Sequence, residues 1–153
     1  MSKRHFWVDA DACPTKEEII TVAFRFEVEL TFVSSQPIKS LMGREGFALL
    51  LCEQGDDVVD DQLVELSHSG DLVITADLLL AKRLLDQAVT VVNFQGQLLN
   101  GDAVKESMGT RQIVLAQLDD VGHKRSQKKG RSKSSVFKEG LHNICVKRYS
   151  MNK

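Results

Sequence analysis

The chain of 153 residues has the length of one globular domain. Its hydrophobic content of 42% is sufficient for a packed core, and no apolar run is long enough to cross a membrane. The amino-terminal residues lack the apolar stretch of a signal peptide. Three widely spaced cysteines fit neither a disulfide framework nor a paired zinc-binding pattern. We therefore expect a cytoplasmic protein without a membrane segment.

The net charge of −1 hides two unlike parts of the chain. Residues 1–120 contain 10 Lys and Arg against 20 Asp and Glu, whereas residues 121–153 contain 10 Lys and Arg and only Glu139 as an acid. We expect an α/β domain over 1–120 and a basic carboxyl-terminal arm over 121–153. Charge alone leaves three roles open for this arm, which are contact with nucleic acid, packing on the acidic domain, and solubility.

Strands and helices are expected to alternate along the first 120 residues. Pro14 favours the first turn of a helix, and Glu17 and Glu18 suit the positive end of the helix dipole. In chain order we predict strand 5–9, helix 14–25, strand 28–34, a loop with one weak helical turn over 36–46, strand 47–52, helix 58–69, strand 72–75, helix 78–87, strand 89–93 and helix 104–118. Such alternation predicts an α/β protein with a mainly parallel sheet of about five strands.

Aspartates follow two of these strands, where open parallel sheets form their sites. Asp9 and Asp11 follow the first strand, and Asp77 follows the fourth. If those two strands are neighbours, their acidic ends lie on the same rim of the sheet. Near the start of the helix predicted over 58–69, Asp57, Asp60 and Asp61 have a spacing of three and four residues. This spacing predicts that one helical face carries all three.

A cluster of four carboxylates needs a compensating charge. At separations of about 5 Å and an effective dielectric constant near 20, each pair repels by about 3 kcal/mol. Domains are stable by only about 5–15 kcal/mol, so protonation, basic partners or a divalent cation must offset this repulsion. Oxygen ligands of this kind suit Mg²⁺ or Mn²⁺, and a cation held there can activate water for attack on a phosphodiester.

Other roles compete for the same residues. Asp56 or Asp57 could cap the second helix and Asp77 the third, because aspartate is a common helix cap. Cys13 lies near a predicted helix start, but the position six residues later is Ile19 and not the arginine of a cysteine-dependent phosphatase.

Three blocks of the chain resemble the bacterial YaiI/YqxD family, which is placed with the PIN-like nuclease domains. The blocks are VDADACPTK (8–16), GDDVVDDQL (55–63) and GDLVITADLLLA (70–81), and the resemblance runs from about residue 6 to residue 118. It implies a PIN-like three-layer α/β/α sandwich. It also implies a cluster of acidic residues that binds Mg²⁺ or Mn²⁺ and cleaves single-stranded RNA.

The resemblance assigns roles to individual residues. Asp9, Asp60 and Asp77 match the acidic positions of the PIN-like site, and Thr75 matches the threonine of its T-x-D block. Asp11 and Asp57 belong to blocks of this family and would add ligands. Arg111 matches a family arginine and is expected to contact nucleic acid, with RNA as the expected partner. The charge of the arm adds further expected contacts: Lys124, Arg125, Lys128, Lys129, Arg131 and Lys133. PIN-like domains often form dimers, which leaves a homodimer open.

Three functions remain in competition at this point. The first is a metal-dependent nuclease in which Asp9, Asp60 and Asp77 bind the metal, Asp11 or Asp57 orients water or a second ion, and Thr75 holds a carboxylate. The second is a phosphatase of the haloacid-dehalogenase type, because VDADA imitates its D-x-D start, in which the first aspartate is a nucleophile and the second a general acid. The third is a non-catalytic nucleic-acid-binding protein that kept the fold without the reaction.

Overall fold

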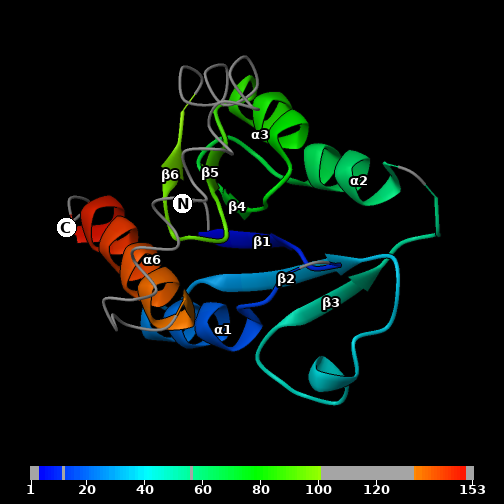
Figure 1. The fold of residues 1–153 in the computed structure, drawn as a ribbon, viewed down its shortest axis with the longest axis horizontal. Coiled ribbons are helices and arrows are strands. Elements are labelled where there is room, and N and C mark those ends of the chain that lie inside the picture. Colours follow the sequence, from blue (N-terminus) through cyan, green and yellow to red (C-terminus); the bar gives the residue numbers. More distant parts are fainter. Residues whose placement is uncertain (1–3, 12, 56, 101–132, 151–153) are drawn as a thin grey trace, which may run out of the picture.

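The computed structural model describes residues 4–11, 13–55, 57–100 and 133–150 (Figure 1). The strands are β1 (His5–Asp9), β2 (Glu29–Ser34), β3 (Ala48–Leu51), β4 (Leu72–Ile74), β5 (Thr90–Val92) and β6 (Leu98–Leu99). The helices are α1 (Lys16–Arg25), α2 (Val58–Leu66), α3 (Leu78–Leu85) and α6 (Lys133–Ser150), with the 3-10 turn η1 at Lys39–Leu41. The predicted helix 104–118 lies outside the described residues.

The strands form one sheet in the order β3-β2-β1-β4-β5-β6. Neighbouring strands are parallel except for β5 and β6, which are antiparallel. The prediction of a mainly parallel sheet is confirmed, and β1 and β4 are neighbours. The sixth strand was not predicted, because β6 contains only two residues and follows directly on the turn at Gly96.

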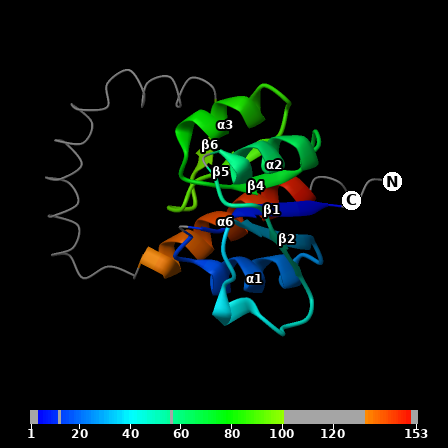
Figure 2. The same ribbon diagram turned by 90° about the vertical axis from the view of Figure 1, so that its right-hand side faces the viewer.

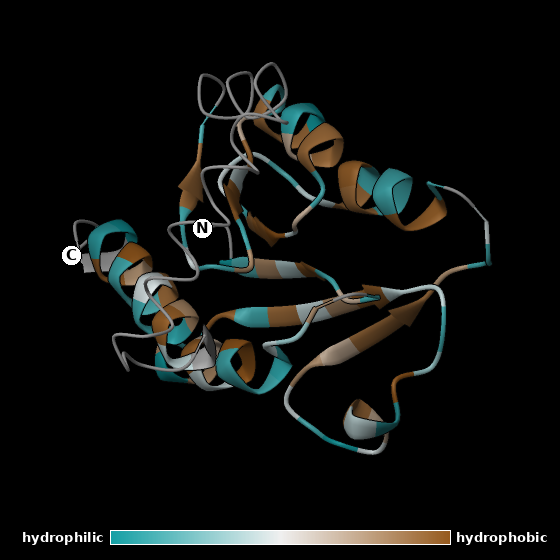
Figure 3. Cartoon of the chain, viewed as in Figure 1, coloured by the Kyte–Doolittle hydropathy of each residue, from teal (hydrophilic) through white to brown (hydrophobic). Residues whose placement is uncertain are grey.

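Helices cover both faces of the sheet. Helices α1 and α6 lie on one face and α2 and α3 on the other (Figures 1 and 2). In Figure 3 the strands are predominantly hydrophobic and each helix carries both hydrophobic and hydrophilic residues. The predicted three-layer α/β/α sandwich is therefore confirmed, and it is consistent with a PIN-like fold.

Each face of the sheet has its own hydrophobic core. On β1, Phe6 and Val8 contribute to the core under α1 and α6, whereas Trp7 packs with the core under α2 and α3. On β4, Leu72 and Ile74 belong to the first core and Val73 to the second. Side chains alternate between the two faces along a strand, so the residues two positions after Trp7 and Val73 are also directed to the face of α2 and α3. These residues are Asp9 and Thr75.

Helix α1 begins at Lys16, so the predicted start at Pro14 is wrong. The chain first makes a turn, in which the backbone N–H of Cys13 donates to the carbonyl of Ala10 at 3.4 Å. Thr15 then occupies the position before the helix, with φ of −120° and ψ of 39°, which is not a helical conformation. The turn that precedes the helix therefore uses two more residues than expected. The weak helical turn predicted within 36–46 is present as η1.

Helix α6 packs against α1 and completes the first core. Its residues Phe137, Leu141 and Cys145 are spaced four apart and fully buried. No helix was predicted in the basic arm over 121–153, yet the backbone is helical from Lys133 to Ser150. No helix among the described residues combines the length and the apolar character that crossing a membrane requires.

Candidate functional site

The strand order reverses between β1 and β4. The sheet is built outwards from β1 in one direction and from β4 in the other, and open α/β sheets bind ligands where the order reverses in this way. Asp9 is the last residue of β1, and Thr75 directly follows β4. Figure 2 shows this edge from the side at which the strands end, with α2 and α3 above the strands and α1 below them.

Thr75 connects the two strand ends. Its side chain is fully buried, and its Oγ1 donates a hydrogen bond of 2.8 Å to Oδ2 of Asp9. The same hydroxyl accepts a hydrogen bond of 3.1 Å from the backbone N–H of Asp77. One threonine thus orients a carboxylate on β1 and positions the backbone that leads into α3.

Asp77 caps α3, one of the two roles weighed for it from the sequence. Its Oδ1 accepts hydrogen bonds from the backbone N–H groups of Leu79 at 2.9 Å and Leu80 at 3.1 Å. These bonds satisfy donors that a helix start leaves without partners. Both bonds go to the same oxygen, and the carboxyl group of Asp77 also interacts with Asp60. The cap therefore fixes the carboxylate just beyond the end of β4, next to Asp60.

Asp60 reaches the same place from α2. It is the third residue of that helix and is half-buried. The pKa of Asp60 is raised to about 6, chiefly by burial and also by the negative charges of Asp77, Asp9 and Asp57 and a hydrogen bond with Asp77. This pKa indicates that the carboxyl group lies in a crowded negative environment.

The pKa of Asp9 is affected by burial and by neighbouring aspartates as well. Burial raises its pKa, the hydrogen bond from Thr75 lowers it, and the charges of Asp11 and Asp77 raise it, with a net upward shift. We call Asp9, Asp60, Thr75 and Asp77 the acidic edge. The structure brings these four predicted residues together from β1, α2 and the segment that follows β4.

Asp11 does not join the acidic edge. Its Oδ1 accepts hydrogen bonds from the hydroxyl of Ser34 at 2.7 Å and the backbone N–H of Ser35 at 3.0 Å, and its Oδ2 accepts from the hydroxyl of Ser35 at 2.9 Å. Burial opposes ionisation here, but these hydrogen bonds outweigh it and hold the pKa of Asp11 below its ordinary value. The turn after Asp9 thus places the second aspartate at the end of β2.

Asp57 and Asp61 also depart from the expected arrangement. The prediction that one helical face carries Asp57, Asp60 and Asp61 is wrong, because Asp57 precedes α2 in a left-handed conformation with φ of 66°. Its side chain is exposed and makes no capping hydrogen bond. Asp61 forms an ion pair of 3.0 Å with Arg83 of α3. Of the three, Asp60 is the residue that contributes to the acidic edge.

The acidic edge suits a divalent cation by the chemistry of its donors. Carboxylate oxygens are the ligands that Mg²⁺ and Mn²⁺ prefer, and the raised pKa of Asp60 signals excess negative charge. Nevertheless, among the described residues no group of three or more His, Cys, Asp or Glu side chains is already arranged to hold a metal ion. Asp60 and Asp77 are hydrogen-bonded to each other instead.

One of the predicted nucleic-acid contacts lies in the described part of the chain. Lys133 is the first residue of α6. Outside the described residues lie Arg111, Lys124, Arg125, Lys128, Lys129 and Arg131.

Three residues near the site were not singled out from the sequence. Ser34 and Ser35 bind Asp11, and Lys16 donates a hydrogen bond of 2.5 Å from Nζ to the carbonyl of Cys13. A pair of serines directly after an apolar strand was the available signal, because the ends of neighbouring parallel strands share one edge. Only the structure shows that the chain directs Asp11 towards these serines, so the sequence alone did not identify its partners.

Comparison with known proteins links the chain to a bacterial group. Residues 7–147 match a family described as "Uncharacterized BCR, YaiI/YqxD family". The chain is 37% identical to a "UPF0178 protein" of Maridesulfovibrio salexigens over 110 residues, which cover 71% of this chain and 72% of the relative. It is 38% identical over 112 residues to a "UPF0178 protein" of Aliivibrio fischeri, with 71% of this chain and 73% of the relative covered. No solved structure is significantly similar to the chain.

Proposed function

Because the chain belongs to the YaiI/YqxD family, whose description states no activity, we propose its function from its own residues: a metal-dependent nuclease that hydrolyses phosphodiester bonds in RNA. The observation that carries the proposal is the convergence of Asp9, Asp60 and Asp77 at the point where the strand order reverses. Neighbouring carboxylates repel one another, and the pKa values of Asp9 and Asp60 are raised, so the ionised cluster is unfavourable for the folded state and a cation that neutralises it explains its presence.

Asp9, Asp60 and Asp77 would bind Mg²⁺ or Mn²⁺. When bound, such an ion supplies positive charge that stabilises the transition state of phosphodiester hydrolysis and lowers the pKa of water. The chain contributes orientation. Thr75 holds Oδ2 of Asp9, and the start of α3 holds Oδ1 of Asp77, so two of the three carboxylates have a fixed direction before the substrate arrives.

In this proposal, the protonation of Asp60 also makes metal binding depend on pH. Its pKa of about 6 means that it is mostly ionised at neutral pH and mostly protonated below pH 5. Release of its proton ends the hydrogen bond with Asp77 and frees both carboxylates for a cation. Metal binding should therefore strengthen as the pH rises from 5 to 7.5.

The phosphatase alternative is less compatible with the geometry. It needs Asp11 as a general acid that protonates a leaving group above Asp9. Three hydrogen bonds from Ser34 and Ser35 hold Asp11 at the end of β2, and they lower its pKa. A carboxyl group that is this readily ionised is a poor proton donor at neutral pH.

A non-catalytic nucleic-acid-binding protein is the second candidate. One observation favours it: within the described part of the chain no three potential ligands are already set to hold a metal ion. Under this alternative, Asp77 is a helix cap and the other carboxylates are remnants of a site.

Cleavage of a fluorescently labelled single-stranded RNA distinguishes the two. We expect the full-length protein to cleave with Mn²⁺ and not with EDTA. We expect Asp9→Asn to lower the rate at least about 100-fold, because it removes a charged ligand. Asp61→Asn is the matched control, since Asp61 is next to Asp60 but pairs with Arg83. Salt-dependent RNA binding without cleavage by the wild type would instead favour the non-catalytic protein.

A further inference from the structure

A second polar cavity adjoins the acidic edge on the opposite face of the sheet. It encloses about 470 Å³ at the ends of β1 and β2, a volume within the range of small-molecule sites. We call it the Lys16 pocket, and the lining residues used below are Asp11, Lys16, Ser35, Gln36, Pro37 and Ile38.

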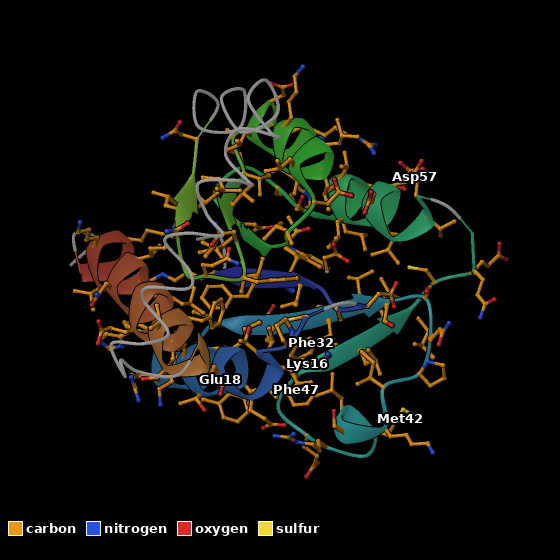
Figure 4. The ribbon with its side chains drawn as sticks, in the orientation of Figure 1. Lys16, Glu18, Phe32, Met42, Phe47 and Asp57 are labelled. Carbon is orange, nitrogen blue, oxygen red and sulfur yellow. The ribbon has the colours of Figure 1, made fainter. Side chains whose placement is uncertain are left out.

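The pocket and the acidic edge share the end of β1. Asp9 belongs to the acidic edge, while Ala10 and Asp11 line the pocket. Figure 4 shows Lys16 at the α1 side of the sheet and Asp57 at the start of α2 on the other side. A linear polymer that lies across the end of β1 would therefore contact both the acidic edge and the Lys16 pocket.

Lys16 brings a positive charge into the pocket, where the carboxylate of Asp11 carries a negative one. It is half-buried, and its Nζ donates to the carbonyl of Cys13, which fixes the end of a flexible side chain. An ammonium group has three N–H donors, so this bond leaves donors for another acceptor. The charge of Lys16 helps to lower the pKa of Asp11, but the hydrogen bonds of Asp11 come from Ser34 and Ser35, so none of the N–H donors of Lys16 is used on it.

The remaining lining fits the other parts of a nucleotide. The amide of Gln36 can both donate to and accept from the edge of a base. Pro37 and Ile38 supply apolar surface for the face of a base. A cation, an amide and an apolar wall in one cavity correspond to the phosphate, the base edge and the base face of a nucleotide.

We propose that the Lys16 pocket binds the nucleotide next to the scissile phosphate of a single-stranded RNA, with Lys16 as a positioning residue that contacts its phosphate. This inference rests on the proposed function, because the acidic edge defines which phosphate is scissile. RNA brings negative charge to an edge that is already negative, and a cation one nucleotide away reduces the repulsion.

Binding of a labelled single-stranded hexanucleotide RNA, measured by fluorescence anisotropy in EDTA, tests the pocket without cleavage. We expect Lys16→Gln to weaken binding about tenfold at low salt, the loss expected for one charged hydrogen bond. The slope of log K against log salt should fall by about 0.7, which corresponds to one phosphate contact on a single strand. Lys16→Arg keeps the charge and should restore both values to within about threefold of the wild type.

Lys82→Gln is the matched control, because Lys82 is an exposed lysine of α3 outside the pocket and its loss changes the net charge equally. Circular dichroism verifies that each variant is folded. If Lys16→Gln and Lys82→Gln give the same affinity and the same salt slope, the pocket does not bind phosphate and the inference is overturned. If Lys16→Arg fails to restore binding, the inference is overturned as well.

Two further arms separate this inference from the proposed function. Adenosine monophosphate and adenosine are compared by calorimetry, and the pocket is expected to prefer the nucleotide in the wild type but not in Lys16→Gln. Loss of that preference together with absent cleavage supports the pocket and rejects the nuclease. Cleavage that depends on Asp9, combined with unchanged binding by Lys16→Gln, supports the nuclease and rejects the pocket.

Discussion

At the scale of single residues, the acidic edge disfavours the ionised form of Asp60. Its carboxyl group interacts with three other aspartates, and its pKa is raised to about 6. Asp11 is the contrasting case, since hydrogen bonds from two serines lower its pKa despite burial. The fold therefore favours the ionised form of an aspartate at the end of β2 and the protonated form of another at the start of α2.

The raised pKa has a definite sign for stability. The unfolded chain ionises Asp60 near pH 3.8 and the folded chain near 6, so the folded state favours the protonated form. The stabilising contribution is complete below pH 3.8 and is lost as the pH rises towards 6. We expect Asp60→Asn to stabilise the metal-free protein at pH 8 by about 1 kcal/mol, after allowance for solvent screening of a half-exposed group. Chemical denaturation at pH 8 and pH 4 in EDTA measures the difference.

Asp61→Asn again serves as the control, because it removes the neighbouring charge and breaks the pair with Arg83. We expect no stabilisation from it at pH 8. Equal effects of the two substitutions at both pH values would contradict the assignment of the raised pKa to the acidic edge.

At the scale of elements, the attachment of α6 depends on two glycines. A Cβ on Gly140 would lie 2.4 Å from the carbonyl oxygen of Gly96, and a Cβ on Gly96 would lie 2.7 Å from the carbonyl oxygen of Phe137. Gly96 also has a φ of +80°, which other residues rarely adopt. The turn between β5 and β6 therefore contacts α6 backbone to backbone.

Gly140→Ala should be destabilising even though alanine favours helices by about 1 kcal/mol over glycine. The new methyl group meets backbone that cannot rotate away, and we expect a net loss of about 1–3 kcal/mol. Thermal unfolding of the variant measures this loss. Asn143→Ala, at an exposed position of the same helix, should be neutral or slightly stabilising. A stabilised Gly140→Ala variant would show that the two backbones are not in contact.

At the scale of the whole molecule, the basic carboxyl-terminal region includes part of the main core. Phe137, Leu141 and Cys145 are fully buried in the same cluster as Phe6 and Val8 of the central strand. Arg25 of α1 contacts His142 of α6 at 3.1 Å, and Arg148 donates to the carbonyl of Gly70 at 2.7 Å. Helix α6 is thus joined to α1 and to the segment before β4.

We expect Phe137→Ala to destabilise the full-length protein by about 3–5 kcal/mol, the usual loss for a fully buried aromatic side chain. Val136→Ala is the control at the adjacent exposed position, with an expected loss below about 1 kcal/mol. Urea unfolding of both variants tests whether residues 1–120 and 121–153 are separate units. An independent arm would leave the stability of the domain unchanged in both variants.

Local sequence patterns were sufficient for most of the sheet and for the aspartates of the acidic edge, whereas Thr75 was identified only through the resemblance to a known family. Short apolar runs predicted β1 to β5, because buried parallel strands are continuously apolar. Helix α6 was missed because Phe137, Leu141 and Cys145 are interleaved with the exposed Val136 and Val146, which hides the period of the buried face.

The sequence by itself determined the α/β alternation and the presence of aspartates after the first and fourth strands. It could do so because strand propensity and helix periodicity depend on neighbouring residues. Only the tertiary structure decided which carboxylates meet. The turn after β1 separates Asp11 from Asp9, and the left-handed residue before α2 separates Asp57 from Asp60. These directions depend on partners such as Ser34 and Thr75, which lie more than twenty residues away in the chain and become neighbours only when the strands pair.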